Sequence, residues 1–569
     1  MKKIALLYII ALLPAISSLA QDSDTLQRAV TIVKEFTPIV RDAEKINTMP
    51  SVATPSFNRD SVQYNYNATS TAVPTIATDV NIPYIPTPAN NDRKYRGYFD
   101  AGIGNYLALT GNAGYHILDT PHDKLNIGAQ FTSLNWDVPI NSHASAIGES
   151  LTRQTFYDAR AGLHYAHTFD NNISVSLRGA YRFLDFNYYG VAGVAPVGSD
   201  VHPFNRVNNL YAELQIDNKE AQHYDYEHWY ATAGYSLYRN KRGAYVPTPS
   251  SEHHAYLKGG YSYMLDQYWS VGGVLNIDYL QYNGVIHLDN SPETPGYVLN
   301  TNNVFMARLL PHVEYRKDRF NFHAGVKVDI SANDKTVFRF APDIRMDWEF
   351  HENYFLQANI EGGKKLHTWH DMSQQCIYFD PSYRIPSTYS PLDAKVGFRF
   401  RFIPELSLSA YAGYEVAAGA LFQSVEASSQ AIAWQSIDAS CFKLGARVEA
   451  YVLQYVTLSA DIAYREWKQK NGSLISYDKP RWESNARVTI HPHKLFDIEL
   501  GYNMQLGRDY GIYGKLNDIH NVQAMVTYHP NQWLSIFVQG NNLLNCKYDY
   551  YYGLPAPRIQ GMVGAELKF

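Results

Sequence analysis

A period-two alternation of apolar and polar residues runs through the chain from Gly97 onward. Between Phe320 and Ile330 one parity is apolar, whereas the other carries Asn321, His323 and Lys327. Because successive side chains of a strand point to opposite faces, each such stretch is predicted to be a strand with one apolar and one polar face. The alternation alone fits both a soluble sandwich and a membrane barrel with apolar residues outside and polar residues inside.

The connections between these stretches separate the two folds, because they alternate between tight turns and mostly long links. Short turns on one side and long loops on the other are typical of bacterial outer-membrane barrels. Ten tight turns and eleven outer links predict an all-β fold, a transmembrane antiparallel up-and-down β-barrel of about 22 strands. The predicted tight turns fall at residues 120–123, 170–172, 218–225, 265–267, 317–319, 351–353, 404–405, 453–455, 491–494 and 529–532.

The aromatic content supports the membrane interpretation. Aromatic residues make up 14% of the chain and include 46 tyrosines, while the mean hydropathy is slightly polar. Strands that face lipid on one side and water on the other have this composition, and aromatic residues beside the tight turns are expected to form an interfacial girdle. The net charge of −5 is spread along the chain, so nucleic acid is not expected as a partner.

The first 20 residues are predicted to be a secretory signal peptide. Lys2 and Lys3 precede an apolar run over residues 4–13, and small residues follow at 18–20. No later segment has the ~18 consecutive apolar residues that a spanning helix needs. The remaining choices for an exported chain are a soluble protein or an outer-membrane barrel, and the connection pattern favours the barrel in the outer membrane of a Gram-negative bacterium.

Residues 21–95 differ from the rest of the chain. They contain seven prolines, and no glycine occurs before Gly97. We interpret them as an extended periplasmic or lumenal segment that docks on a larger body, and residues 96–569 as the transmembrane barrel.

The closing stretch, residues 533–569, carries a family resemblance. Two alternating runs flank a loop rich in Asn, Gly and Tyr, and the last run ends on an aromatic residue. This stretch resembles the closing hairpin of TonB-dependent outer-membrane receptors, which implies a barrel that transports or binds a solute. The resemblance is carried by Asn542, Leu543, Leu544, Asn545, Tyr548, Gly553, Pro555, Pro557 and Arg558.

The N-terminal segment departs from that family. TonB-dependent receptors have a longer, glycine-rich globular plug, so the chain is predicted to be a receptor-like barrel without a recognisable plug domain. The resemblance implies TonB as a partner, but residues 28–33 are only weakly similar to the short apolar box that such receptors offer to TonB. A docking strand of another purpose is the favoured interpretation, and outer-membrane or periplasmic proteins are possible partners of the chain.

Catalytic and metal-site motifs are absent from the sequence. It contains no nucleophile elbow, phosphate-binding loop or His-Glu-x-x-His helix, so we predict neither an enzyme nor a cofactor. The three cysteines are far apart and form no framework or metal spacing. His367, His370 and Asp371 lie together in one long link, where solvated surface is favoured over a metal site.

Two functions remain open. In the first, the lumen passes or binds a solute; in the second, the barrel is a structural subunit of an outer-membrane complex. For the first, basic residues on the lumen parity would favour anionic groups, and aromatic residues of one outer loop could stack on a flat ligand or a sugar. A lumen this wide needs filling, which we expect from the N-terminal segment and from infolded loops. The lumen candidates are Arg178, Arg182, Lys327, Arg399 and Arg401, and the outer-loop candidates are Trp369, Tyr378 and Tyr383.

Overall fold

The structure is a computed structural model of the 569-residue chain. The residues that it describes are 95–140, 150–187, 204–218, 227–242, 249–288, 296–300, 303–332, 336–379, 381, 385–403, 405–425, 432–453, 455–510, 514–551 and 554–569. Within these ranges, no helix has the length and apolar character that a membrane-crossing helix needs.

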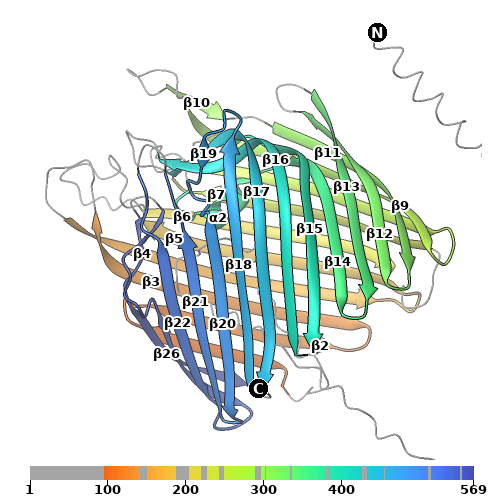
Figure 1. Ribbon diagram of the computed structural model, residues 1–569. Helices are drawn as coiled ribbons and strands as arrows, with labels where there is room; N and C mark the ends of the chain where they lie inside the picture. The colour runs from red at the N-terminus through yellow and green to blue at the C-terminus, as the bar shows by residue number, and fades with distance from the viewer. Residues whose placement is uncertain are drawn as a thin grey trace, which may run out of the picture. The chain divides into compact units, whose positions relative to one another are not determined.

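One antiparallel sheet dominates the described residues (Figure 1). It contains 24 strands, of which β10 and β19 are short extensions, and the other 22 close into a barrel. The predicted strand number and fold class are therefore confirmed. The barrel strands are β1 (Gly97–Gly104), β2 (Leu109–Asp119), β3 (Asp123–Ile140), β4 (Ser150–Thr168), β5 (Ile173–Asn187), β6 (Phe204–Asn218), β7 (Glu227–Asn240), β8 (Ser250–Met264), β9 (Trp269–Leu288), β11 (Asn303–Lys317), β12 (Phe320–Ala332), β13 (Thr336–His351), β14 (Tyr354–Lys365), β15 (Thr388–Ile403), β16 (Leu406–Val425), β17 (Ile432–Leu453), β18 (Val456–Gln469), β20 (Trp482–His493), β21 (Phe496–Leu506), β22 (Ile519–Tyr528), β23 (Leu534–Asn541) and β26 (Gln560–Lys568).

Among the described residues, four short strands and one helix lie outside this ring. β10 pairs with β9 and β19 pairs with β18, while β24 and β25 form a separate two-stranded sheet. The helix α2 lies between β14 and β15. The bounds of these elements are β10 (Gly296–Asn300), β19 (Leu474–Ile475), β24 (Asp549–Tyr551), β25 (Leu554–Pro555) and α2 (Trp369–Gln375).

The last strand closes the barrel against the first. β26 pairs antiparallel with both β23 and β1, as predicted from the closing stretch. The backbone N–H groups of Arg96 and Gly97 donate to the Phe569 carbonyl, each at 2.7 Å. Closure gives each of the 22 described barrel strands a partner on both sides, which matters because lipid could not hydrogen-bond an open strand edge.

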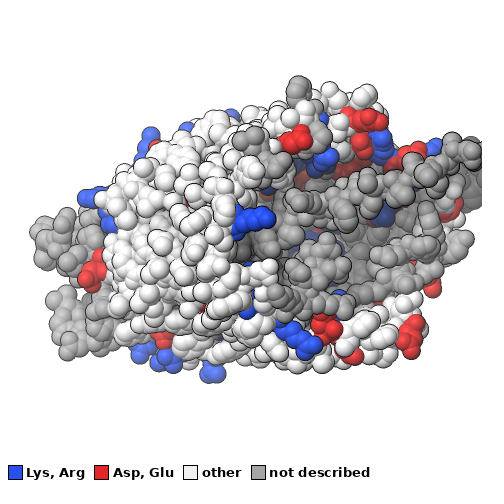
Figure 2. Space-filling view, turned by 90° about the horizontal axis from the view of Figure 1, so that it is seen from below, with Lys and Arg blue, Asp and Glu red and all other residues white. Residues whose placement is uncertain are grey.

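The two faces of the strands follow the predicted parity. On β12, Val326 is 47% exposed on the outside, whereas the side chain of Lys327 is 13% exposed and points inward. On β5, Leu177 and Tyr181 are exposed, while Arg182 on the other parity is buried. Figure 2 shows a broad surface of uncharged side chains, with charged groups mainly at its margins. This face is the lipid-contacting surface.

The tight turns lie at one end of the barrel. The first strand, β1, begins at this same end, and the last strand, β26, ends there. Asn172, Asp318 and Asn353 adopt positive φ angles of 63°, 49° and 69°, as short turns between antiparallel strands require. The predicted turn at 218–225 falls almost entirely outside the described residues. In outer-membrane barrels this end faces the periplasm, so we call it the periplasmic end and the opposite end the outer end.

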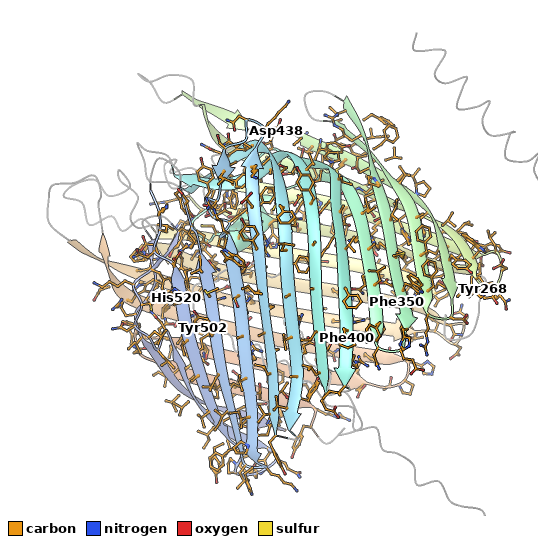
Figure 3. The ribbon with its side chains drawn as sticks, in the orientation of Figure 1. Tyr268, Phe350, Phe400, Asp438, Tyr502 and His520 are labelled. Carbon is orange, nitrogen blue, oxygen red and sulfur yellow. The ribbon has the colours of Figure 1, made fainter. Side chains whose placement is uncertain are left out.

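Aromatic residues form a girdle along the periplasmic end of β9–β15, as predicted. Tyr268, Phe350 and Phe400 lie along this rim (Figure 3). Trp269 packs on Tyr315 with ring centroids 4.7 Å apart, and similar contacts join Phe320 to Trp348 and Tyr354 to Phe400. Aromatic rings prefer the membrane–water interface, so the girdle marks the membrane boundary at this end.

Candidate functional site

Carboxylates neutralise two of the predicted lumen-facing arginines. Arg182 donates to both oxygens of Asp158, at 2.9 and 2.8 Å, and Arg160 also binds this carboxylate. Arg178 donates to Glu213 at 3.2 Å. These arginines face the lumen as predicted, but their charges are matched by acids on neighbouring strands.

The other three predicted basic residues differ from one another. Lys327 lies between Asp343 and Glu361, at 3.7 and 3.6 Å, so it is also paired. Arg399 is exposed to the lumen and stacks over the Phe355 ring at 4.6 Å. Arg401 is exposed beside it on β15. A surplus positive charge in this set is therefore confined to the periplasmic end of β15.

The link between β14 and β15 crosses the barrel at its outer end (Figure 1). We call residues 366–387 the crossing loop; the structure describes 366–379, 381 and 385–387 of it. Thr368 caps α2 by accepting a hydrogen bond from the Asp371 N–H at 2.9 Å, and Asp371 accepts in turn from the Thr368 N–H. This capping box satisfies backbone donors where the chain leaves the strand and enters the lumen.

Glu252 of β8 anchors the start of the helix. Its carboxylate, buried to 1% exposure, accepts the backbone N–H groups of Trp369 at 2.5 Å and His370 at 3.3 Å. The Trp369 ring packs against Tyr238 and Tyr282, with centroids 6.5 and 4.9 Å away. The loop is therefore fastened to strands that lie several positions around the barrel from its own.

The end of the loop reaches still farther around the barrel. The Tyr378 hydroxyl accepts from the Gln154 amide of β4 at 2.7 Å, and its ring packs edge-on against Phe186 of β5. β4 lies nearly half-way around the ring from β15. These contacts carry the loop across the lumen into an apolar cluster, which includes Leu134, Trp136, Phe156, Leu184, Phe186, Tyr238, Trp369, Met372, Cys376, Ile377, Tyr378, Phe379, Leu421, Trp434, Tyr551 and Met562.

This packing corrects the prediction for the outer-loop aromatics. Trp369 and Tyr378 are 2% and 6% exposed, so their faces stabilise the loop and are not presented to a solute. Tyr383 lies outside the described residues. Solvated surface was expected for His367, His370 and Asp371: Asp371 is exposed, whereas His370 contacts Asn209 of β6 and His367 contacts Thr388 at 2.9 Å. The two histidines and Asp371 therefore hold the loop in place.

Burial also sets the protonation of the loop. Desolvation, reinforced by Lys365, lowers the pKa of His367 to about 3, and desolvation with nearby Arg182 and Arg160 lowers the pKa of His370 to about 3. Burial raises the pKa of the Cys376 thiol to about 12. Both imidazoles and the thiol are thus neutral at pH 7.

A second outer-end segment is tied to the crossing loop. The Tyr551 hydroxyl of β24 donates to the Gln375 carbonyl at 2.5 Å. Arg508 donates to the carbonyls of Asp549 and Tyr550, each at 2.6 Å, and so holds β24 from the β21–β22 side. The crossing loop and β24 form one connected closure at the outer end.

Below β24, the lumen wall carries a ladder of amide side chains. Asn503 donates to Asn485 at 2.6 Å, and Asn485 donates to Asp461 at 3.3 Å. A second run joins three further strands, in which Asn521 donates to Asn541 at 2.9 Å and Asn541 to Gln560 at 2.8 Å. Asn503 and Asn521 face each other in register between the two runs. The strand pairing aligns one amide from each successive strand into a row.

A cavity of about 450 Å³ lies along this wall. Tyr548 and Tyr550 line it together with the ladder, so β24 contributes to both the cavity and the outer closure. Asp461, Glu483 and Glu499 outnumber Arg487 among its charged residues. We call the lumen-facing residues of β18 and β20–β23 in this cavity the polar wall. They are Ser459, Asp461, Glu483, Asn485, Arg487, Glu499, Asn503, Gln505, Asn521, Gln523 and Gln539.

Sequence analysis missed the polar wall, because each amide is unremarkable on its own strand. Asn485, Asn503 and Asn521 each occupy the lumen parity of an alternating stretch, and this signal was available. Their alignment depends on strand register, which the sequence pattern does not supply.

Comparison with known proteins shows the fold. No protein family and no characterised protein matches the chain by sequence. Among solved structures, the ferric enterobactin receptor PfeA of Pseudomonas aeruginosa matches with a TM-score of 0.64 and 10% identity, covering 83% of this chain and 80% of that one. The FrpB iron transporter of Neisseria meningitidis matches with a TM-score of 0.63 and 10% identity, covering 84% of this chain and 81% of that one. The copper transporter OprC matches with a TM-score of 0.60 and 10% identity, covering 83% of this chain and 80% of that one. The chain thus has the barrel fold of TonB-dependent outer-membrane receptors.

Proposed function

Given this receptor-type barrel fold, we propose that the chain takes up a polar solute across the outer membrane and binds it along the polar wall. The observation that carries the proposal is the 450 Å³ cavity lined by amides and carboxylates beneath the closure of the crossing loop and β24. Ligand sites commonly have volumes of about 300–1,000 Å³. The cavity therefore matches a small solute.

The charge of the cavity favours neutral or cationic solutes over anions. Arg465 pairs with Glu483 at 2.7 Å, which leaves Asp461 and Glu499 facing Arg487. The Asn and Gln amides offer both donors and acceptors, and Tyr548 and Tyr550 add aromatic groups. This combination suits a polyhydroxylated ligand such as an oligosaccharide. The anion preference expected from the basic residues applies only near Arg399 and Arg401.

The structural role is the second candidate function. The crossing loop supports this role, because it closes the outer end and a closed barrel can serve as a scaffold. The polar wall supports uptake instead, because a scaffold has no need for a cavity lined by hydrogen-bonding groups. The similar solved structures also support uptake, because their names describe receptors and transporters.

The test is solute binding by the purified full-length barrel. We expect a neutral oligosaccharide mixture to protect the polar wall, seen as reduced labelling of an introduced Asn485→Cys thiol, whereas an anionic sugar phosphate at equal concentration protects less. Cys376, Cys441 and Cys546 are first replaced by Ala or Ser so that only the introduced thiol reacts. Equal labelling under all conditions, together with stoichiometric co-purification of another outer-membrane protein, would favour the structural role.

A further inference from the structure

A separate group of side chains on the β11–β13 wall has the composition of a transition-metal site. His312, Glu314 and His323 each offer one ligand atom, and these atoms all lie within 4.8 Å of one another. His312 and Glu314 lie two residues apart on β11, so both point into the lumen. His323 is the register partner of Glu314 on β12. Two adjacent strands thus bring three donors together without any loop.

Glycines leave room for the imidazole of His312. Its register partners on both sides are glycines, Gly272 on β9 and Gly325 on β12. A Cβ on Gly272 would lie 2.6 Å from the His312 Nε2 atom, and a Cβ on Gly325 would lie 3.1 Å from its Cβ. Real Cβ atoms essentially never lie as close as 2.6 Å, so the position of this ring depends on Gly272, while a side chain at position 325 would crowd the His312 Cβ. The His312 ring stacks on His323, with centroids 4.9 Å apart.

His323 is oriented as metal-bound histidines commonly are. Its Nε2 atom lies 3.3 Å from Asp343, whose side chain is fully buried, and its Nδ1 atom lies 3.3 Å from Glu314. A ligating histidine typically donates its second ring N–H to a carboxylate, which fixes the tautomer and raises the basicity of the other nitrogen. Asp343 can take that supporting role, which leaves Nδ1 and Glu314 to share an ion.

The distances suit a small divalent ion. Two donors bound tetrahedrally at about 2.0–2.1 Å are separated by roughly 3.4 Å, close to the Nδ1–Oε1 distance of His323 and Glu314. We propose that His312, Glu314 and His323 bind Zn²⁺ or another late first-row divalent ion. Two imidazoles and one carboxylate are the ligand types that such ions prefer, whereas Mg²⁺ and Ca²⁺ prefer oxygen alone.

The surrounding charges permit this binding. Arg316 binds the other oxygen of Glu314 at 2.7 Å, and it is an exposed side chain that can turn away. Arg345 and Lys327 approach Asp343 at 3.1 and 3.7 Å, so that carboxylate is already balanced and remains in its supporting position. Glu314 and His323 are 26% and 15% exposed at the side chain, which lets an ion enter from the lumen and leaves a fourth position for water or a solute.

The test uses full-length, untagged protein in detergent, stripped with a chelator and titrated with Co²⁺ alone. We expect the visible absorption bands of four-coordinate Co²⁺ to saturate at one ion per chain and to disappear when Zn²⁺ is added. H323A and E314Q should abolish the bands, and D343N should weaken affinity about tenfold or more, the usual effect of losing a supporting partner. Heat-modifiable gel mobility checks that each variant retains its barrel.

His529 provides the matched control. It lies in another lumen cluster, where Asp497 binds His529 at 2.9 Å and His491 at 2.6 Å through different oxygens. H529A should keep the full Co²⁺ signal. Absence of saturable bands, full binding by H323A and E314Q, or an equal loss in H529A would each overturn the proposed site.

Discussion

Two walls of the same lumen have opposite chemistry at the outer end. On β3–β9, the lumen faces turn apolar and pack the crossing loop, whereas the polar wall on β18 and β20–β23 keeps a row of amides around a cavity. We call the first the packed wall; it includes Leu134, Trp136, Phe156, Leu184, Phe186 and Tyr238. Strand parity is the same on both walls, so parity alone decides only which residues face inward. What those residues contact decides whether the wall closes the barrel or offers a path.

The difference assigns separate tasks to the two walls. Apolar burial fastens the crossing loop to the packed wall, whereas hydrogen bonds order the amides of the polar wall. β24 joins them, because Tyr551 holds the crossing loop while Tyr548 and Tyr550 line the cavity.

Trp369→Ala should have the largest effect, because it weakens the packing of the crossing loop on the packed wall. Truncating a buried aromatic typically costs about 3–5 kcal/mol, and here the loss falls on the closed position of the crossing loop. We expect faster proteolytic cleavage within residues 366–387 and a higher single-channel conductance, with the barrel still heat-modifiable. Trp533→Ala is the matched control, because Trp533 is 50% exposed near the periplasmic turn. Equal behaviour of the two variants would remove the packed wall from the closure.

Acid should release the crossing loop more gradually. The pKa values of His367 and His370 fall from the ordinary 6.5 to about 3 in the closed loop. The closed loop therefore binds fewer protons than the released loop does. Its stabilisation is complete above pH 6.5 and is lost as the pH falls toward 3. Conductance should rise between pH 7.5 and pH 5. The double variant H367Q/H370Q should lose this response, and an unchanged response would assign it to other groups.

Asn503→Leu should have the smallest effect on the barrel and a selective effect on the polar wall. Asn503 is solvent-accessible and donates to Asn485, so its loss should change barrel stability by less than about 1 kcal/mol. A solute that hydrogen-bonds this amide should bind about tenfold more weakly, as for an unpaired polar group worth roughly 1.4 kcal/mol. Isothermal titration measures this loss of affinity, with the oligosaccharide that gives the strongest protection in the labelling test. Ser407→Leu on β16, outside the cavity, is the control.

The fold could be predicted from the sequence because its signals are local. Alternation and the positions of tight turns determine strand number and lumen parity, and β12 and the closing hairpin follow them directly. The amide ladder, the crossing loop and the His312 cluster depend on register and on contacts between distant strands. The outer ends of β3 and β5 did contain a signal, since their lumen parity becomes apolar at Leu134 and Leu184. That loss of alternation marks where an internal element packs.

The segment upstream of the barrel stays a prediction. The signal peptide at residues 1–20 and the Pro-rich segment at 21–95 fall outside the described residues, except for Tyr95. A lumen of 22 strands needs filling, and the crossing loop supplies part of it. We expect the N-terminal segment to fill more, so that deletion of residues 21–90 raises conductance modestly.

The most direct test of the closure is single-channel conductance in planar bilayers of two chains that both lack residues 21–90. One chain keeps the crossing loop, and in the other a short Gly-Ser linker replaces residues 366–387. Because the loop spans the lumen from β15 to β4, the chain without it should conduct several-fold more and admit larger solutes. Equal conductance in the two chains would contradict the account, since the crossing loop would then not close the barrel.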